Sequence, residues 1–418
     1  MPLLPFRGRR LNIIIMNLEV PNKFKGVLKT AYSAAEILLR PISRKYDVGE
    51  HTYPKELDIL AAALSGANHA SGGAIGGATS AREVVVPGAK KVLKNGGNMS
   101  NCLNIQGISY GDVGLLLSFP GQGLGNAAIA AVSNDEQLSR FGKMWAAMAI
   151  TEPNVGSDSA AITATARKEG NNYILNGEKI FVTSGERCDC VVVWATLDKG
   201  IGRAAIKSFI VLRSNPGMKL ERVEKKLGIR ASDTAAFVLT DCVVPASDLL
   251  GNPEIDVKKG FGGVMETFDN TRPFVASMAL GCMQAAIERT REILSEKINL
   301  KDHKTPINKL KAAQAQFYRM EADYEAARLL VLRAAWMADN KVPNSMEASI
   351  CKAKAGRVGV EITLKCVELC SSLGYSYQEL LEKWSRDSKI LDIFEGTQQI
   401  QQLIIARRML GKGSSELK

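Results

Sequence analysis

The segment ILDIFEGTQQIQQLIIARRMLG, residues 390–411, places a carboxylate, Glu395, directly before a glycine and a threonine. The residues up to Phe394 are mostly apolar, and after Thr397 the apolar positions recur at helical spacing. Thr397 is therefore expected to cap a helix that ends at Gly411. A carboxylate beside a helix N-terminus can simply complement the helix dipole. In an apolar pocket, however, the ionised form is destabilised, and the same carboxylate becomes a stronger base.

Two earlier stretches carry polar groups that could bind a ligand. In AMAITEPNVGSD, the backbone amides together with Thr151 and Ser157 could bind a polar ring edge or a phosphorylated ligand, although loop capping explains the same residues. In KIFVTSGE, Phe181 and Thr183 share one side of a predicted strand because side chains alternate along it. An aromatic ring and a hydroxyl group on one face suit a flat cofactor.

The chain divides into three long regions: a helical region, a strand-rich region and a second helical region. Helical periodicity dominates residues 20–140 and returns after Gly260, in segments long enough to pack as a bundle. Between them, NYILNGEKIFVTSG is predicted to be a hairpin around Asn176-Gly177, and CDCVVVWATL, IKSFIVLR and AAFVLTDCVVP are predicted strands. The predicted fold is α+β, with a disordered leader (1–19), an N-terminal helical domain (20–144), a middle β domain (145–258) and a C-terminal helical bundle (259–418).

Composition argues against several classes of function. With 46% hydrophobic and 23% charged residues over 418 positions, the chain has the balance of a globular protein, and no apolar run approaches the roughly 18 residues of a membrane span. The net charge of +11 is spread along the chain, without the basic stripe of a nucleic-acid site. None of the eight cysteines forms a C-x-x-C pair, and three histidines are too few for a histidine-rich metal site. We therefore expect buried thiols in a reducing compartment, and neither a metal nor a nucleic-acid partner.

Five stretches together resemble the acyl-CoA dehydrogenase family: AMAITEPNVGSD, NYILNGEKIFVTSGE, KKLGIRASDTAAFVLTDCVVP, FDNTRPFVAS and RDSKILDIFEGTQQIQ. The resemblance extends over roughly residues 120–411 and is looser in the N-terminal helices. It implies a C-terminal four-helix bundle, FAD between the sheet and that bundle, an acyl-CoA substrate, and an electron-transfer flavoprotein as electron acceptor.

The resemblance implies that Glu395 is the base that removes the acyl α-proton, while the β-hydrogen leaves as hydride to the flavin and a trans-2-enoyl-CoA forms. The Glu395 backbone N–H and a flavin ribityl hydroxyl would stabilise the charge that develops on the thioester oxygen. Some family members carry the base on an earlier bundle helix. The matching residue here is Thr271, which cannot act as a base, so Glu395 is the sole candidate.

The same resemblance assigns further site residues, position by position. The isoalloxazine contacts are Ile150, Thr151, Phe181 and Thr183, and those on the adenosine side are Thr397 and Gln399. The substrate-binding residues are Ser157, Asp269 and Arg272 along the CoA channel, with Phe394 and Gly396 at the acyl pocket. Asp269 and Arg272 also have the spacing of an ordinary ion pair on a helix.

Family members usually form tetramers in which a neighbouring subunit binds the FAD pyrophosphate. This chain departs from the sequence motifs that make those contacts. Leu300, His303 and Lys304 stand where an R-x-x-F-G segment has Arg, Phe and Gly; Leu310-Lys311 replace an aromatic- or His-Gln pair; and Glu368 with Ser371-Ser372 replace Gln and Gly-Gly. Leucine offers a pyrophosphate nothing, and glutamate repels it. We therefore expect a heteromeric complex in which a paralogous subunit supplies the ADP-binding half, the alternative being a homotetramer with rearranged contacts.

Two rival functions remain at this point. One is a catalytically weak or structural subunit of a heteromeric acyl-CoA dehydrogenase, and the other is a nucleic-acid-binding relative of the fold. The expected compartment is the bacterial cytosol in preference to the mitochondrial matrix, because the basic first fifteen residues are short and lack serine for a transit peptide. The sequence does not specify the acyl group.

Overall fold

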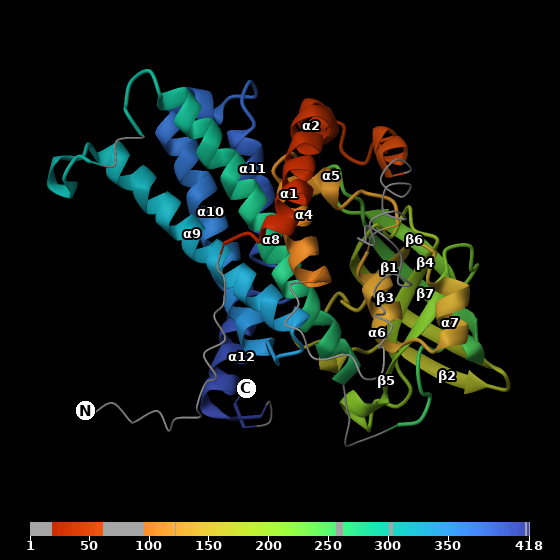
Figure 1. Cartoon of the computed structure of the whole chain (residues 1–418). Helices are drawn as coiled ribbons and strands as arrows, with labels where there is room; N and C mark the ends of the chain where they lie inside the picture. Colours follow the sequence, from red (N-terminus) through yellow and green to blue (C-terminus); the bar gives the residue numbers. More distant parts are fainter. Residues whose placement is uncertain are drawn as a thin grey trace.

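The computed structural model describes residues 19–61, 96–121, 123–255, 262–300, 304–413 and 416–417, with only the backbone of 262–270 and of residue 307. A helical bundle and a β-sheet lie on opposite sides of the molecule, and the first helices of the chain lie against both (Figure 1). Most of the predicted leader and His303 are outside the described residues, as is the side chain of Asp269. The predicted α+β order of helices, sheet and helices is confirmed.

Short helices make up the N-terminal part. They are α1 (Asn22–Ala34), a π-helical turn (Ala35–Leu39), α2 (Arg40–Val48), α4 (Gly97–Ser109), α5 (Val113–Leu116), α6 (Leu124–Val132) and α7 (Asp135–Phe141). The start of α7 is a reciprocal capping box, in which Asn134 Oδ1 accepts from the Gln137 N–H and Gln137 Oε1 accepts from the Asn134 N–H. Helix α1 packs on α4, and α4 packs in turn on the C-terminal bundle.

The middle of the chain folds into one seven-stranded mixed sheet in the order β1-β4-β2-β3-β7-β6, with β5 on the other edge of β4. Its strands are β1 (Ala146–Ala149), β2 (Thr165–Glu169), β3 (Asn172–Thr183), β4 (Cys190–Thr196), β5 (Ile206–Leu212), β6 (Met218–Val223) and β7 (Thr234–Pro245). Every residue of β4 is buried, because one face of the strand packs in the core of the sheet and the other packs against α6 and α7. This explains why CVVVWAT reads as a continuous apolar run rather than an alternating one.

The predicted hairpin around Asn176-Gly177 is wrong. Strand β3 runs unbroken through both residues and pairs with β7, and the register shifts between Leu175 and Gly177. Gly177 has φ +147°, and a Cβ there would lie 2.7 Å from the Ala164 Cβ. The Asn-Gly pair therefore forms a β-bulge, which needs the same backbone freedom as a hairpin turn.

Five helices follow the sheet: α8 (Gly262–Leu294), α9 (Ala312–Asp339), α10 (Ser345–Tyr375), α11 (Leu381–Leu391) and α12 (Gln398–Leu410). Helices α8, α9, α10 and α11 pack together as a bundle around the largest apolar core of the described residues, and α12 lies on α10. All eight cysteines are buried free thiols, as predicted. Within the described ranges, no helix is long and apolar enough to cross a membrane, and no cluster of side chains could hold a metal ion.

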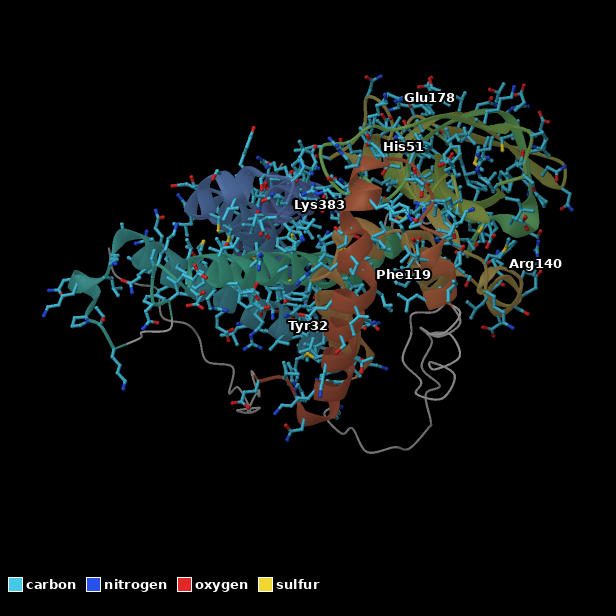
Figure 2. The ribbon with its side chains drawn as sticks, turned by 90° about the horizontal axis from the view of Figure 1, so that it is seen from above. Tyr32, His51, Phe119, Arg140, Glu178 and Lys383 are labelled. Atoms are coloured by element: carbon cyan, nitrogen blue, oxygen red, sulfur yellow. The ribbon has the colours of Figure 1, made fainter. Side chains whose placement is uncertain are left out.

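Buried charged groups join the bundle to the N-terminal helices. The Lys383 ammonium of α11 lies 2.7 Å from Asp112 at the start of α5 and 2.5 Å from Asp387, and all three side chains are buried. Asp387 also accepts a hydrogen bond from the Ile229 N–H, in the loop before β7. Figure 2 shows Lys383 where the bundle faces the N-terminal helices. These contacts fix α11, and the turn that follows it, relative to the rest of the chain.

Candidate active site

Glu395 lies in the turn between α11 and α12, and the backbone of that turn is unusual. Glu395 has φ +54° and Gly396 has φ +96°, so two consecutive residues occupy conformations that disfavour side chains. The Gln401 side-chain amide, from the first turn of α12, donates at 3.0 Å to the carbonyl oxygens of both residues. A Cβ on Gly396 would lie 2.5 Å from Gln401 Nε2, so only glycine leaves room for this amide. These hydrogen bonds therefore hold the turn in one conformation, which sets the direction of the Glu395 side chain.

The carboxyl group of Glu395 is held from α8. Thr271 Oγ1 donates a 2.7 Å hydrogen bond to Glu395 Oε2 across 124 positions of sequence. Burial raises the pKa of Glu395, while this hydrogen bond and the charges of Arg272 and Lys352 lower it, and the net result is a pKa above the ordinary value of 4.5. Of the two interpretations of the sequence, a carboxylate made more basic by its surroundings therefore describes this group.

Lys352, on α10, is a site residue that the sequence interpretation missed. Its side chain is 0% exposed, and its ammonium group donates a 2.6 Å hydrogen bond to the Gly396 carbonyl oxygen. Burial lowers the pKa of Lys352 to about 8, against the opposing charges of Asp392 and Glu395. Lys352 follows the buried Ala348 by four positions and precedes the buried Ala355 by three. The sequence signal that could have identified Lys352 is therefore a charged residue at a position where helical periodicity expects an apolar one.

Helix α12 begins and ends as predicted, at Thr397 and Gly411, and Gly411 is left-handed with φ +64°. However, the Thr397 side chain accepts no hydrogen bond from α12, all of which is described, so its hydroxyl group remains available beside Glu395. Gln399 points into solvent from the first turn of the same helix. Phe394 is partly buried and packs against the core of the bundle.

A second group of predicted site residues comes together at the end of β1. Ile150 and Thr151 directly follow this strand, and β3 holds both: Lys179 Nζ donates to the Ile150 carbonyl oxygen at 3.0 Å, and the Ile180 N–H donates to the Thr151 carbonyl oxygen at 2.9 Å. Lys179 is buried in a 2.8 Å ion pair with Glu152. This pair, which the sequence interpretation also missed, anchors the predicted cofactor-binding loop to the sheet.

Phe181 and Thr183 lie farther along β3, where the register against β7 shifts a second time between Lys179 and Val182. Phe181 lies within this shift, and Thr183 follows it. Phe181 has φ +59° and is 61% exposed, Thr183 is partly exposed, and Val182 between them is buried. Phe181 could therefore present its ring, and Thr183 its hydroxyl group, to a flat ligand, which is the role that the sequence predicts for them.

The predicted CoA-channel residues differ in their surroundings. Ser157 is exposed on the loop after β1, whereas the Arg272 side chain is buried beside Thr271. An Arg272 guanidinium in that position contributes to the electrostatics of Glu395, as its effect on the pKa of Glu395 indicates.

The residues that stand in place of the family's pyrophosphate-binding motifs lie in different surroundings. Leu300 is 3% exposed within the core of the bundle, Lys304 is exposed, and Lys311 precedes the first turn of α9 with Leu310 partly buried before it. Glu368 is exposed and forms an ion pair with Lys365, which reduces the repulsion expected of a lone carboxylate. Ser371 interrupts α10 with φ +52° and ψ −128°.

Solved structures of the same fold include acyl-CoA dehydrogenases. The chain superimposes on butyryl-CoA dehydrogenase from Megasphaera elsdenii with a TM-score of 0.78, at 28% identity, over 94% of this chain and 100% of that one. It also shares its fold with a glutaryl-CoA dehydrogenase from Mycobacterium smegmatis in complex with FADH2, at a TM-score of 0.76 and 21% identity over 95% of this chain and 96% of that one.

Sequence comparison agrees with the fold. Residues 147–242 match the family model of the acyl-CoA dehydrogenase middle domain, and residues 258–410 match that of the C-terminal domain. The short-chain specific acyl-CoA dehydrogenase of rat mitochondria is 31% identical over 409 residues, which cover 96% of this chain and 93% of the relative. The chain belongs to the acyl-CoA dehydrogenase family, whose members are FAD-dependent oxidoreductases.

Proposed function

We propose that this chain catalyses the α,β-dehydrogenation of an acyl-CoA thioester to a trans-2-enoyl-CoA, with Glu395 as the base. One observation carries the proposal. The left-handed turn presents Glu395 with its Oε2 held by Thr271, in surroundings where burial raises the pKa of the carboxyl group. A carboxylate whose pKa is raised toward the working pH accepts a proton more readily than one in water.

Two groups of Glu395 would take part in the reaction, namely its carboxylate and its backbone N–H. The hydrogen bond from Thr271 to Oε2 leaves Oε1 of Glu395 to accept the α-proton. The Glu395 backbone N–H donates to no oxygen atom within the described part of the chain, so it is available to bind the thioester oxygen as negative charge develops there. FAD, when bound, would supply the acceptor for the β-hydrogen.

We assign the cofactor contacts as the sequence predicts them. Ile150, Thr151, Phe181 and Thr183 would face the isoalloxazine, and their common location around β3 supports this. The available hydroxyl group of Thr397 and the exposed side chain of Gln399 support contacts on the adenosine side.

The acyl group is proposed to be short, because the relatives are named short-chain specific or butyryl-CoA dehydrogenases. Electrons would pass to an electron-transfer flavoprotein. A relative from mitochondria and a relative from a bacterium both match, and the bacterial cytosol remains the preferred compartment.

The test is the anaerobic absorbance of the chain purified alone and loaded with FAD, before and after butyryl-CoA is added. The wild-type flavin band should bleach, and Glu395→Gln should bleach about 10³-fold more slowly because the base is lost. Glu361→Gln removes a carboxylate that is exposed on α10, and it should behave as wild type. Equal bleaching in Glu395→Gln and wild type would refute the role of Glu395.

A second candidate is a catalytically weak or structural subunit that depends on a paralogue. The burial of Leu300 in the bundle supports it, since that side chain presents nothing to a neighbour's pyrophosphate. The same preparation separates the two candidates. A chain that retains no FAD alone favours the heteromeric complex, whereas a fully flavinated, active homotetramer rules it out.

A further inference from the structure

Three buried lysines occur in the described part of the chain, and one of them is exceptional. Lys179 lies 2.8 Å from Glu152, and Lys383 lies 2.7 Å from Asp112, so each of these ammonium groups has a carboxylate partner. Lys352 forms no ion pair within the described residues, and its one hydrogen bond there goes to the Gly396 carbonyl oxygen at 2.6 Å. Burying an ammonium group without a carboxylate partner is costly, which suggests a role outside folding.

The Gly396 carbonyl oxygen is the point at which Lys352 can control the base. Gly396 has φ +96°, a conformation from which glycine can readily depart, and it is bonded directly to Glu395. The Lys352 ammonium approaches from α10, whereas Gln401 approaches from α12 and donates to the same oxygen at 3.0 Å. Two donors from different helices therefore hold one carbonyl oxygen, and with it the direction of the Glu395 side chain.

The charged groups around the Glu395-Gly396 turn come from three helices. Arg272 from α8 and Lys352 from α10 are the cations that act on Glu395, and Thr271 donates to it. Asp392, at the end of α11, acts on Lys352 together with Glu395. Burial lowers the pKa of Lys352 to about 8, so the side chain still carries its charge at neutral pH.

We propose that Lys352 is a positioning residue for Glu395: its ammonium group holds the Glu395-Gly396 turn through the Gly396 carbonyl oxygen and favours the ionised carboxylate beside it. The role rests on the proposed function, in which Glu395 is the base. It assigns to α10 a part in the chemistry, beyond its part in the bundle.

The test compares three variants. Lys352→Met removes both the charge and the hydrogen bond, and Lys352→Gln removes the charge but keeps a donor for the Gly396 carbonyl oxygen. Lys354→Met is the control, because Lys354 is two residues away on the same helix and its partly exposed side chain pairs with Asp323 instead. The first measurement is the pH dependence of flavin bleaching by butyryl-CoA.

The acid limb of the bleaching rate should move up by about one pH unit in Lys352→Met and Lys352→Gln, because an ionised Glu395 loses a neighbouring cation. Lys352→Gln should keep more of the rate at high pH than Lys352→Met, since it still holds the turn. Lys354→Met should match wild type in both respects. Acid limbs that coincide with wild type in both Lys352 variants would overturn the proposal, and should Lys352→Met not fold, Lys352→Gln decides alone.

The second measurement does not depend on activity. Thermal denaturation of wild type, Glu395→Gln, Lys352→Gln and the double variant, all loaded with FAD, forms a double-mutant cycle. The two changes in Tm should be non-additive, because each residue acts on the other. If wild type itself fails to bleach, the proposed function fails, and the cycle still decides about Lys352: non-additive changes support the coupling, and additive changes refute it.

Discussion

At the scale of single residues, the reactivity of Glu395 is a balance of opposing interactions. Burial raises the pKa of its carboxyl group, and Thr271, Arg272 and Lys352 each lower it. Because only the ionised form can take up a proton, the acid limb of the reaction should lie above pH 4.5, the ordinary value for glutamate. At higher pH, the base is fully available.

Thr271→Val should shift that acid limb further upward and slow bleaching at neutral pH by about tenfold. The change removes the O–H donor to Glu395 Oε2 and replaces it with a methyl group of similar size, and a hydrogen bond to a charged group contributes roughly 1.5–3 kcal/mol. The measurement is the pH profile of flavin bleaching by butyryl-CoA.

The control for Thr271→Val is Thr290→Val, which alters another buried threonine of α8 with no hydrogen bond to Glu395. Thr290→Val should leave the pH profile unchanged. A Thr271→Val profile that overlays that of wild type would show that the threonine does not act on the base.

At the scale of secondary-structure elements, two of the side chains that the described residues carry at positive φ can be compared. One is Glu395, in the turn between α11 and α12, where the strain accompanies a predicted catalytic group. The other is Ser371, which interrupts α10 at φ +52° and ψ −128°. Ser371 has no comparable chemistry to perform, so its strain is a cost to the stability of the fold.

Ser371→Gly should stabilise the chain, because glycine adopts this conformation without strain. The gain is about 1 kcal/mol, or a rise in Tm of about 2 °C, and thermal denaturation measures it. The neighbouring Ser372 is helical and exposed, so Ser372→Gly should lower the stability by about 0.5 kcal/mol. Changes of the same sign in the two variants would contradict the assignment of the strain to Ser371.

At the scale of the whole molecule, a network of buried charged groups connects the C-terminal bundle to the N-terminal helices. Lys383 bonds to Asp112 and Asp387, and the Ser43 hydroxyl group of α2 donates to Asp112. Burial alone would lower the pKa of Lys383, but the two carboxylates raise it well above the ordinary value, so the ammonium group is charged. The network therefore holds an ammonium group between two carboxyl groups that are buried from water.

Lys383→Met should destabilise the protein by about 3–5 kcal/mol, because it leaves two buried carboxylates without their cation. The loss should be smaller at pH 5.5 than at pH 8, since the unpaired carboxylates can then take up a proton. Thermal denaturation at the two pH values tests this. Lys389→Met, which breaks an exposed pair with Asp392 on the same helix, should cost less than about 1 kcal/mol. Equal losses in the two variants would contradict the prediction.

Local patterns in the sequence were sufficient for much of the fold. The predicted strands IKSFIVLR and AAFVLTDCVVP coincide with β5 and β7 to within one residue, and the helix from Thr397 to Gly411 coincides with α12 and its caps. These elements are specified by neighbouring residues: apolar periodicity and, for α12, a terminal glycine, although the Thr397 side chain makes no capping hydrogen bond. The Asn176-Gly177 pair was assigned wrongly, because its local preference is shared by a turn and by a bulge, and only pairing with β7 selects the bulge.

Short motifs in the chain were enough to predict the family, the order of helices and sheet, and Glu395 as the candidate base. The groups that surround this base could not be predicted in the same way, because they come from distant parts of the chain. Thr271 and Lys352 lie 124 and 43 positions before Glu395, and their contacts at the turn depend on how α8 and α10 pack against it. Burial and distance to a partner set the pKa of a carboxylate, and neither is a property of the residues next to it in the chain.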